Sequence, residues 1–100
     1  MSSNEANQLI GQWVTDPQDV ESIRQYGRVT LEFMKDGQLI YTVRSDDKDQ
    51  KMFLTYHVQG GTLITNQPSD PRVEETPYSV TPDDKLMLAY GGHKSSYIRK

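Results

Sequence analysis

The sequence contains no cysteine, and its 100 residues include one tryptophan and two phenylalanines. Without cysteine, a disulfide framework, a thiolate nucleophile, and zinc or iron–sulfur centres held by cysteine are all excluded. The composition fits a reducing compartment, and we expect the protein to be cytoplasmic. The longest apolar run, 86–90, is far shorter than the ~20 residues of a membrane-spanning helix. No secretory signal is recognisable at residues 1–8, so we expect neither export nor a membrane span.

An excess of positive charge is also missing, because 11 Lys and Arg face 14 Asp and Glu, for a net charge of -3. Proteins that bind nucleic acid usually present a basic surface, and the only basic cluster here is at 93–100. We therefore expect no nucleic-acid partner. A chain of this length buries about 60 to 65% of its unfolded surface around one core, which predicts a single domain over residues 1–100.

The residues that could carry catalytic or metal chemistry are poorly spaced for it. The two histidines are isolated, the acidic run lacks the spacing of an EF-hand, and the adjacent carboxylates point apart in a strand or into water in a turn. No Gly-x-Ser-x-Gly motif is present. We expect no enzymatic activity, no metal and no cofactor from these candidates: His57, His93, Asp46-Asp47-Lys48-Asp49, Glu74-Glu75 and Asp83-Asp84.

Alternation of apolar and polar residues dominates the chain from residue 28 onward. Gly, Asp, Pro and Asn clusters interrupt it roughly every ten residues, which is typical of an antiparallel meander. Together with an earlier segment around the tryptophan, the pattern predicts an all-β fold of about eight strands. The predicted strands cover 8–15, 28–35, 38–44, 52–58, a segment from 63, 73–80, 86–90 and 95–100.

Turn chemistry fixes the register of two predicted hairpins. A two-residue turn in the first would put its large residues on opposite faces. A three-residue loop with Gly37 in the left-handed conformation instead pairs Phe33 with Leu39 and gathers the large residues on one face. In the second hairpin, a two-residue Gly-Gly turn pairs Val58 with Leu63.

Residues 16–27 are the exception to the strand pattern. Asp16 offers an N-cap, Pro17 suits the first helical position, and Gly27 supplies a stop. Ile23 lies three residues after Val20, which gives one apolar stripe. We expect a short helix after the first strand.

About eight antiparallel strands in up-and-down order suit a sheet that curls and closes on itself. Gly11-Gln12-Trp13 on the first strand and Arg99 on the last resemble the lipocalin and wider calycin pattern, in the form of small bacterial lipocalin-like domains. The resemblance implies a barrel or half-barrel in which Trp13 closes one end and Arg99 crosses the indole and binds nearby backbone carbonyls. Gly11 should leave space for the indole, and a guanidinium over its face is worth ~0.5 to 2 kcal/mol.

Five of the six tyrosines fall on the strand phase assigned to the interior. Buried phenols need hydrogen-bond partners, so they indicate either a polar-lined pocket or positions at the barrel rims with wet hydroxyls. On the first interpretation, the protein is a non-enzymatic barrel that binds a small apolar or amphipathic molecule. The predicted lining is Tyr41, Tyr56, Tyr78 and Tyr90 with Phe33, Leu54 and Leu88.

An alternative function comes from apolar residues on the outward phase. If the barrel is closed, they form a patch that a second copy or another protein would cover. The alternative is thus an interaction or homodimerisation module with a solid core and no cavity. A third reading, an isomerase or hydrolase in a calycin-like cup, requires a polar cluster that the sequence does not identify. The outward residues are Met34, Ile40, Phe53, Ile64, Met87 and Ile98.

Overall fold

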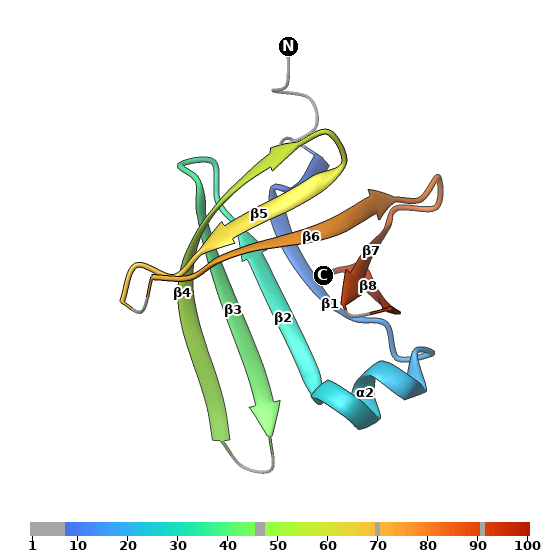
Figure 1. The fold of residues 1–100 in the computed structure, drawn as a ribbon. Coiled ribbons are helices and arrows are strands. Elements are labelled where there is room, and N and C mark those ends of the chain that lie inside the picture. The colour runs from blue at the N-terminus through green and yellow to red at the C-terminus, as the bar shows by residue number, and fades with distance from the viewer. Residues whose placement is uncertain (1–7, 46–47, 70, 91) are drawn as a thin grey trace.

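The computed structural model describes residues 8–45, 48–69, 71–90 and 92–100. Within these residues, eight antiparallel strands form a closed barrel in simple up-and-down order (Figure 1). Closure is made by β1 and β8, where Trp13 lies opposite Arg99. The predicted fold class is confirmed. The elements are β1 (Gly11–Thr15), α2 (Val20–Tyr26), β2 (Arg28–Phe33), β3 (Gln38–Ser45), β4 (Lys48–Gln59), β5 (Thr62–Asn66), β6 (Val73–Val80), β7 (Lys85–Tyr90) and β8 (His93–Arg99).

The two hairpin registers are as predicted. Phe33 pairs with Leu39, and Gly37 has a φ of 87°, the left-handed conformation that the three-residue loop requires. Val58 pairs with Leu63 across a turn whose two glycines both have positive φ. These registers turn the large residues of β2 to β5 toward the barrel interior.

The helix is shorter than the predicted 16–27, and its N-cap is Asp19 rather than Asp16. The reason is local hydrogen bonding. Asp16 Oδ1 accepts from the Gln18 backbone N–H (2.9 Å), which forms a separate turn, and Asp19 then accepts from the Ser22 N–H. The predicted apolar stripe is also wrong at Val20, which is 58% exposed.

The first strand starts later than the predicted residue 8. Gln8 and Leu9 are helical, and the strand begins at Gly11, whose φ is 125°. This turn buries the Leu9 side chain completely beneath one end of the barrel. Its backbone carbonyls then face the neighbouring tryptophan and arginine, as described below.

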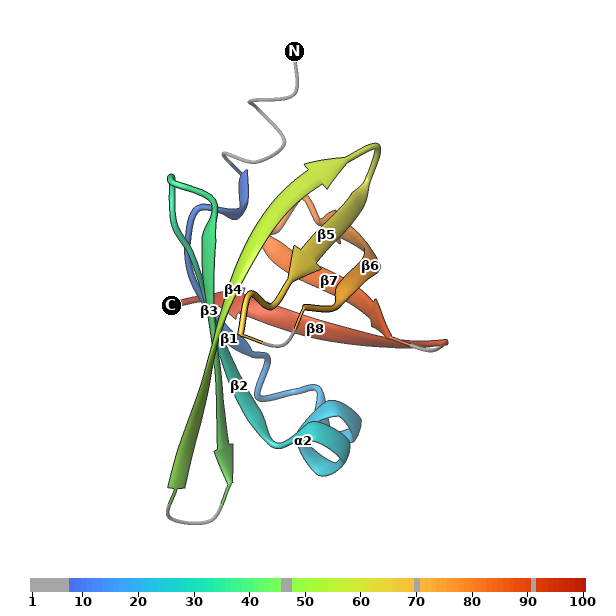
Figure 2. The same cartoon turned by 60° about the vertical axis from the view of Figure 1, so that its left-hand side comes forward.

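The hairpin of β3 and β4 projects well past the other strands (Figures 1 and 2). The register explains this: β4 pairs with β3 from Lys48 to Thr55 but with β5 only from Thr55 to Gln59. Of the predicted acidic hairpin tip, Asp46 and Asp47 lie outside the described residues. No helix in the described part of the chain is long and apolar enough to cross a membrane.

Candidate ligand cavity

A cavity of about 260 Å³ lies inside the barrel and opens on one side to solvent. Inward-facing residues of β2, β3 and β4 line one part of the cavity, and inward-facing residues of β5, β6 and β7 line the rest. Its lining consists of Leu31, Phe33, Leu39, Tyr41, Met52, Leu54, Leu63, Thr65, Gln67, Arg72, Glu74, Thr76 and Leu88.

The inner part of the cavity is apolar. Its walls are leucine and phenylalanine side chains from four strands, and all of them are almost completely buried. Pairing of Phe33 with Leu39 brings two of them side by side, while Leu63 faces them from β5. This floor has no hydrogen-bonding side chains, so it offers an environment for hydrocarbon and not for ions. Its members are Leu31, Phe33, Leu39, Leu63 and Leu88.

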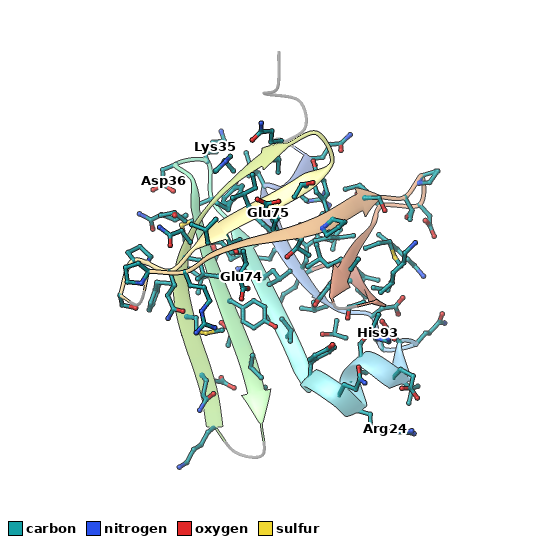
Figure 3. The ribbon with its side chains drawn as sticks, viewed as in Figure 1. Arg24, Lys35, Asp36, Glu74, Glu75 and His93 are labelled. Atoms are coloured by element: carbon teal, nitrogen blue, oxygen red, sulfur yellow. The ribbon has the colours of Figure 1, made fainter. Side chains whose placement is uncertain are left out.

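The outer part of the cavity is polar. Thr65 lies opposite Glu74, and because Leu63 points inward, its partner Thr76 and the alternating residue Glu74 do so too. Arg72, just before β6, also lines the cavity. Figure 3 shows Glu74 and Glu75 leaving β6 on opposite sides. The mouth therefore carries one basic and one acidic side chain next to an apolar interior.

Arg72 and Glu74 were not identified as site residues from the sequence. The signal that could have found them is the alternation itself, counted backward along β6 from Tyr78, which was assigned to the interior. Pro71 and the turn residues before it made this end of the strand difficult to interpret.

Tyr41 lies at the boundary between floor and mouth. Burial raises the pKa of its hydroxyl, and the nearby Tyr26 and Glu74 raise it further. Proximity to groups that carry negative charge when ionised disfavours a phenolate. Tyr41 therefore offers a neutral hydroxyl, which can donate to or accept from a ligand.

The structure brings four of the seven predicted lining residues to the cavity: Tyr41, Phe33, Leu54 and Leu88. It does not bring Tyr56 or Tyr78 there. Tyr56 donates from its hydroxyl to the Met34 carbonyl (2.8 Å), and its ring meets Phe33 edge-on at 5.0 Å. A backbone partner at the barrel rim thus satisfies this phenol without a ligand.

The two remaining predicted tyrosines have different positions. Tyr78 packs partly buried against the core and contributes to a shallow outer hollow between β6 and β7. The side chain of Tyr90 lies outside the described part of the structure, although its backbone pairs with His93 in β8. Whether any of these residues binds a ligand stays a prediction.

Trp13 and Arg99 lie together at one end of the barrel. The guanidinium carbon is 4.1 Å from the indole centroid, and Trp13 Nε1 donates to the Leu9 carbonyl (3.0 Å). Arg99 donates to the carbonyls of Gln8 (2.9 Å) and Ile10 (3.1 Å). One expectation was wrong: the space left by Gly11 is occupied by the guanidinium, since a Cβ there would lie 3.2 Å from Arg99 Nη1.

A second polar cluster links α2 to β8, and His93 lies beside the helix (Figure 3). Ser22 Oγ donates to Asp19 Oδ2 (2.7 Å) and lies 3.0 Å from His93 Nε2 and 2.9 Å from Ser95 Oγ. No sequence pattern indicated this arrangement, because Ser22 and His93 lie 71 positions apart.

This cluster resembles a catalytic triad in composition but not in geometry. A hydroxyl has one proton, and the carboxylate is the strongest acceptor near Ser22. In a catalytic triad the carboxylate orients the histidine, whereas here Asp19 accepts from the Ser22 hydroxyl itself. Ser22 is also only 2% exposed. The cluster therefore attaches the helix to the barrel.

Comparisons with protein-family models, with curated proteins and with solved structures gave no match to this chain. Across the described residues, no three histidine or acidic side chains are grouped closely enough to hold a metal ion.

Proposed function

We propose that this protein is a non-enzymatic barrel that binds a small apolar or amphipathic molecule in the cavity. The observation that carries the proposal is the division of the cavity into an apolar floor and a polar mouth. A floor of buried leucines favours hydrocarbon, and the few polar groups at the rim can fix its orientation.

The volume supports a ligand of modest size. An apolar cavity of about 150 Å³ in a protein core is enough to bind benzene. The cavity of about 260 Å³ is larger, although below the range of roughly 300 to 1,000 Å³ typical of drug-sized ligands. A bicyclic aromatic compound or a medium-length alkyl chain matches this space.

The mouth supports a polar group on that ligand. Arg72 can donate to an acceptor such as a carboxylate or hydroxyl, Glu74 can accept from a donor, and the neutral Tyr41 hydroxyl can do either. With charges of both signs at the rim, no strong preference for an anion or a cation is built in. An alcohol, a phenol or a zwitterion would suit all three groups.

Two observations support this function over the alternatives. The cavity argues against an interaction module with a solid core, and Ser22 is only 2% exposed, which argues against a hydrolytic role for its cluster. The barrel architecture and the contact of Arg99 with Trp13 also support a lipocalin-like protein, a group in which the interior can hold a ligand.

The test is a titration with 2-naphthol, followed by its fluorescence, on the wild type and two variants of β5. Thr65 faces the cavity, and Ile64 is its neighbour on the outer face, so they accept the same new side chain on opposite sides of one strand. We expect Thr65→Phe to fill the cavity and weaken binding at least about tenfold, because the new side chain displaces the aromatic ring of the ligand from its apolar contacts. Ile64→Phe should bind as the wild type does.

Equal affinities in the two variants would place the ligand elsewhere, and no saturable binding to the wild type by 2-naphthol or by octanoate would contradict the proposal. Circular dichroism of both variants establishes that the barrel is folded. Native mass spectrometry of protein purified gently from its own host would, in addition, show the mass of any retained molecule.

A further inference from the structure

The first half of β4 is an open edge in an otherwise closed barrel. Residues 48–54 pair with β3 on one side, but β5 pairs only with the second half of the strand. Both views of the ribbon show this segment projecting past β5 and β6 (Figures 1 and 2). An unpaired strand edge is a template for another strand.

The direction of the free backbone groups follows from a single hydrogen bond. The Tyr56 N–H donates to the Gly37 carbonyl (2.9 Å), so the backbone of Tyr56 faces β3. Because direction alternates along a strand, Asp49, Lys51 and Phe53 turn their N–H and C=O groups away from β3. No described residue bonds to these groups.

We infer that this edge pairs with the same edge of a second copy of the chain, in a symmetric antiparallel arrangement. A twofold axis between strands requires residue i to face residue j and j to face i. With the axis at Gln50, Asp49 faces Lys51 of the partner subunit, and both are residues whose backbone groups point outward. Each such pair exchanges both N–H···O bonds.

The charges select this register. Asp49 and Lys51 lie on the same face of β4, so the twofold axis creates two equivalent pairs of Asp49 with Lys51 of the partner subunit. Opposite charges placed directly across a ladder attract. If the axis lay one residue further along, at Lys51, that lysine would face Lys51 of the partner subunit and repel it. Within its own chain, Asp49 Oδ1 lies 3.9 Å from Arg44 Nε.

The same pairing covers exposed apolar surface. Met52 is 38% exposed, and the register places it opposite Lys48 of the partner subunit, whose alkyl stem can cover the thioether. Met52 also lines the cavity mouth, so the partner would contribute a side chain at the entrance. The inference is independent of the proposed function, because it depends on the edge and not on a ligand.

The test uses two charge reversals, Asp49→Lys and Lys51→Asp, and sedimentation velocity of each alone and of the two mixed. An interface of one short strand pair is small, so the wild type should dimerise weakly. The dimer should become measurable as the protein concentration is raised to about 1 mM. Each variant alone places like charges across the axis twice. Its dimer should therefore have a dissociation constant at least about tenfold higher than that of the wild type. The equimolar mixture restores opposite charges at both positions and should recover dimers.

Recovery in the mixture supports the pairing and also shows that both variants are folded. A wild type that stays monomeric over this range overturns the inference, and so do variants that dimerise like the wild type or a mixture that stays monomeric. A wild type whose β4 edge instead carries a bound peptide, seen by native mass spectrometry, would equally overturn it, because the edge would then serve another partner.

Discussion

At the scale of single residues, Arg99 holds one end of the barrel closed. Its ion pair with Asp84 (2.8 Å) is partly exposed to solvent and should contribute little. The bonds to the carbonyls of Gln8 and Ile10 and the contact with the fully buried Trp13 matter more, because these groups have fewer alternatives in water. The arginine thus links the turn at residues 8–10 to β8.

We expect Arg99→Met to lower the free energy of unfolding by about 1 to 3 kcal/mol, since methionine keeps an alkyl stem over the indole but donates to no carbonyl. Urea denaturation followed by the fluorescence of Trp13 measures the change. The matched control is Arg24→Met on α2, where the arginine makes only an exposed pair with Glu21. Equal losses in the two variants would contradict the role assigned to Arg99.

The sequence was informative at this scale where a residue's role is local. The hairpin register predicted the left-handed conformation of Gly37, and the resemblance to the lipocalin pattern implied the contact between Trp13 and Arg99. The space beside Gly11 was assigned to the wrong side chain, because a missing Cβ shows where room exists but not which neighbour enters it. Long side chains such as arginine reach positions that strand phase does not predict.

At the scale of elements, two carboxylates attach the segment around α2 to the barrel. Asp16 accepts from the Gln18 N–H and lies 3.2 Å from Lys85 Nζ, and Asp19 accepts from the Ser96 N–H of β8 (2.8 Å). Hydrogen bonding by Gln18 lowers the pKa of Asp16. Burial opposes ionisation of Asp19, but its hydrogen bonds with Ser22 and Ser96 outweigh that effect and lower its pKa.

These shifts predict a loss of stability in acid. A carboxyl whose pKa is below 3.8 in the folded protein binds fewer protons than the unfolded chain does, so it stabilises the fold above that pH and the stabilisation is lost as the pH falls through the folded value. Urea denaturation at pH 7 and at successively lower pH should show the decline. Asp19→Asn should be less stable than the wild type at pH 7, and the difference should shrink as the pH falls below 3.8.

The control for this series is Glu75→Gln, an exposed carboxylate on the outer face of β6. It should follow the wild-type curve at every pH. If Asp19→Asn kept the full acid sensitivity of the wild type, the network between α2 and β8 would not be a source of that sensitivity.

Strand registers could be predicted at this scale, whereas the start of the helix could not. The hairpins depend on residues a few positions apart, and a one-residue slip would have turned Phe33 and Leu39 to opposite faces. Both Asp16 and Asp19 are good capping residues, and the choice between them depends on Ser96 and Lys85, which are distant in the sequence.

At the scale of the whole molecule, barrel closure brings residues from six strands, β2 to β7, around one cavity. Alternation predicted which side chains point inward, including Tyr41, Phe33, Leu54 and Leu88. It could not predict the height of each residue along the barrel axis, which separates Tyr41 at the cavity from Tyr56 at the rim. Strand tilt and stagger determine that height, and they are properties of the closed sheet.

The most direct test of the binding function is a methyl NMR spectrum of leucine-labelled protein during titration with 2-naphthol. The chain supplies its own control, because some leucines line the cavity while Leu9 and Leu86 are buried in the core away from it. If the ligand binds in the cavity, the methyl signals of Leu39, Leu54 and Leu63 should shift with a common saturation curve while those of Leu9 and Leu86 stay in place. Saturating shifts confined to Leu9 and Leu86, or no shift at any leucine, would contradict the binding function.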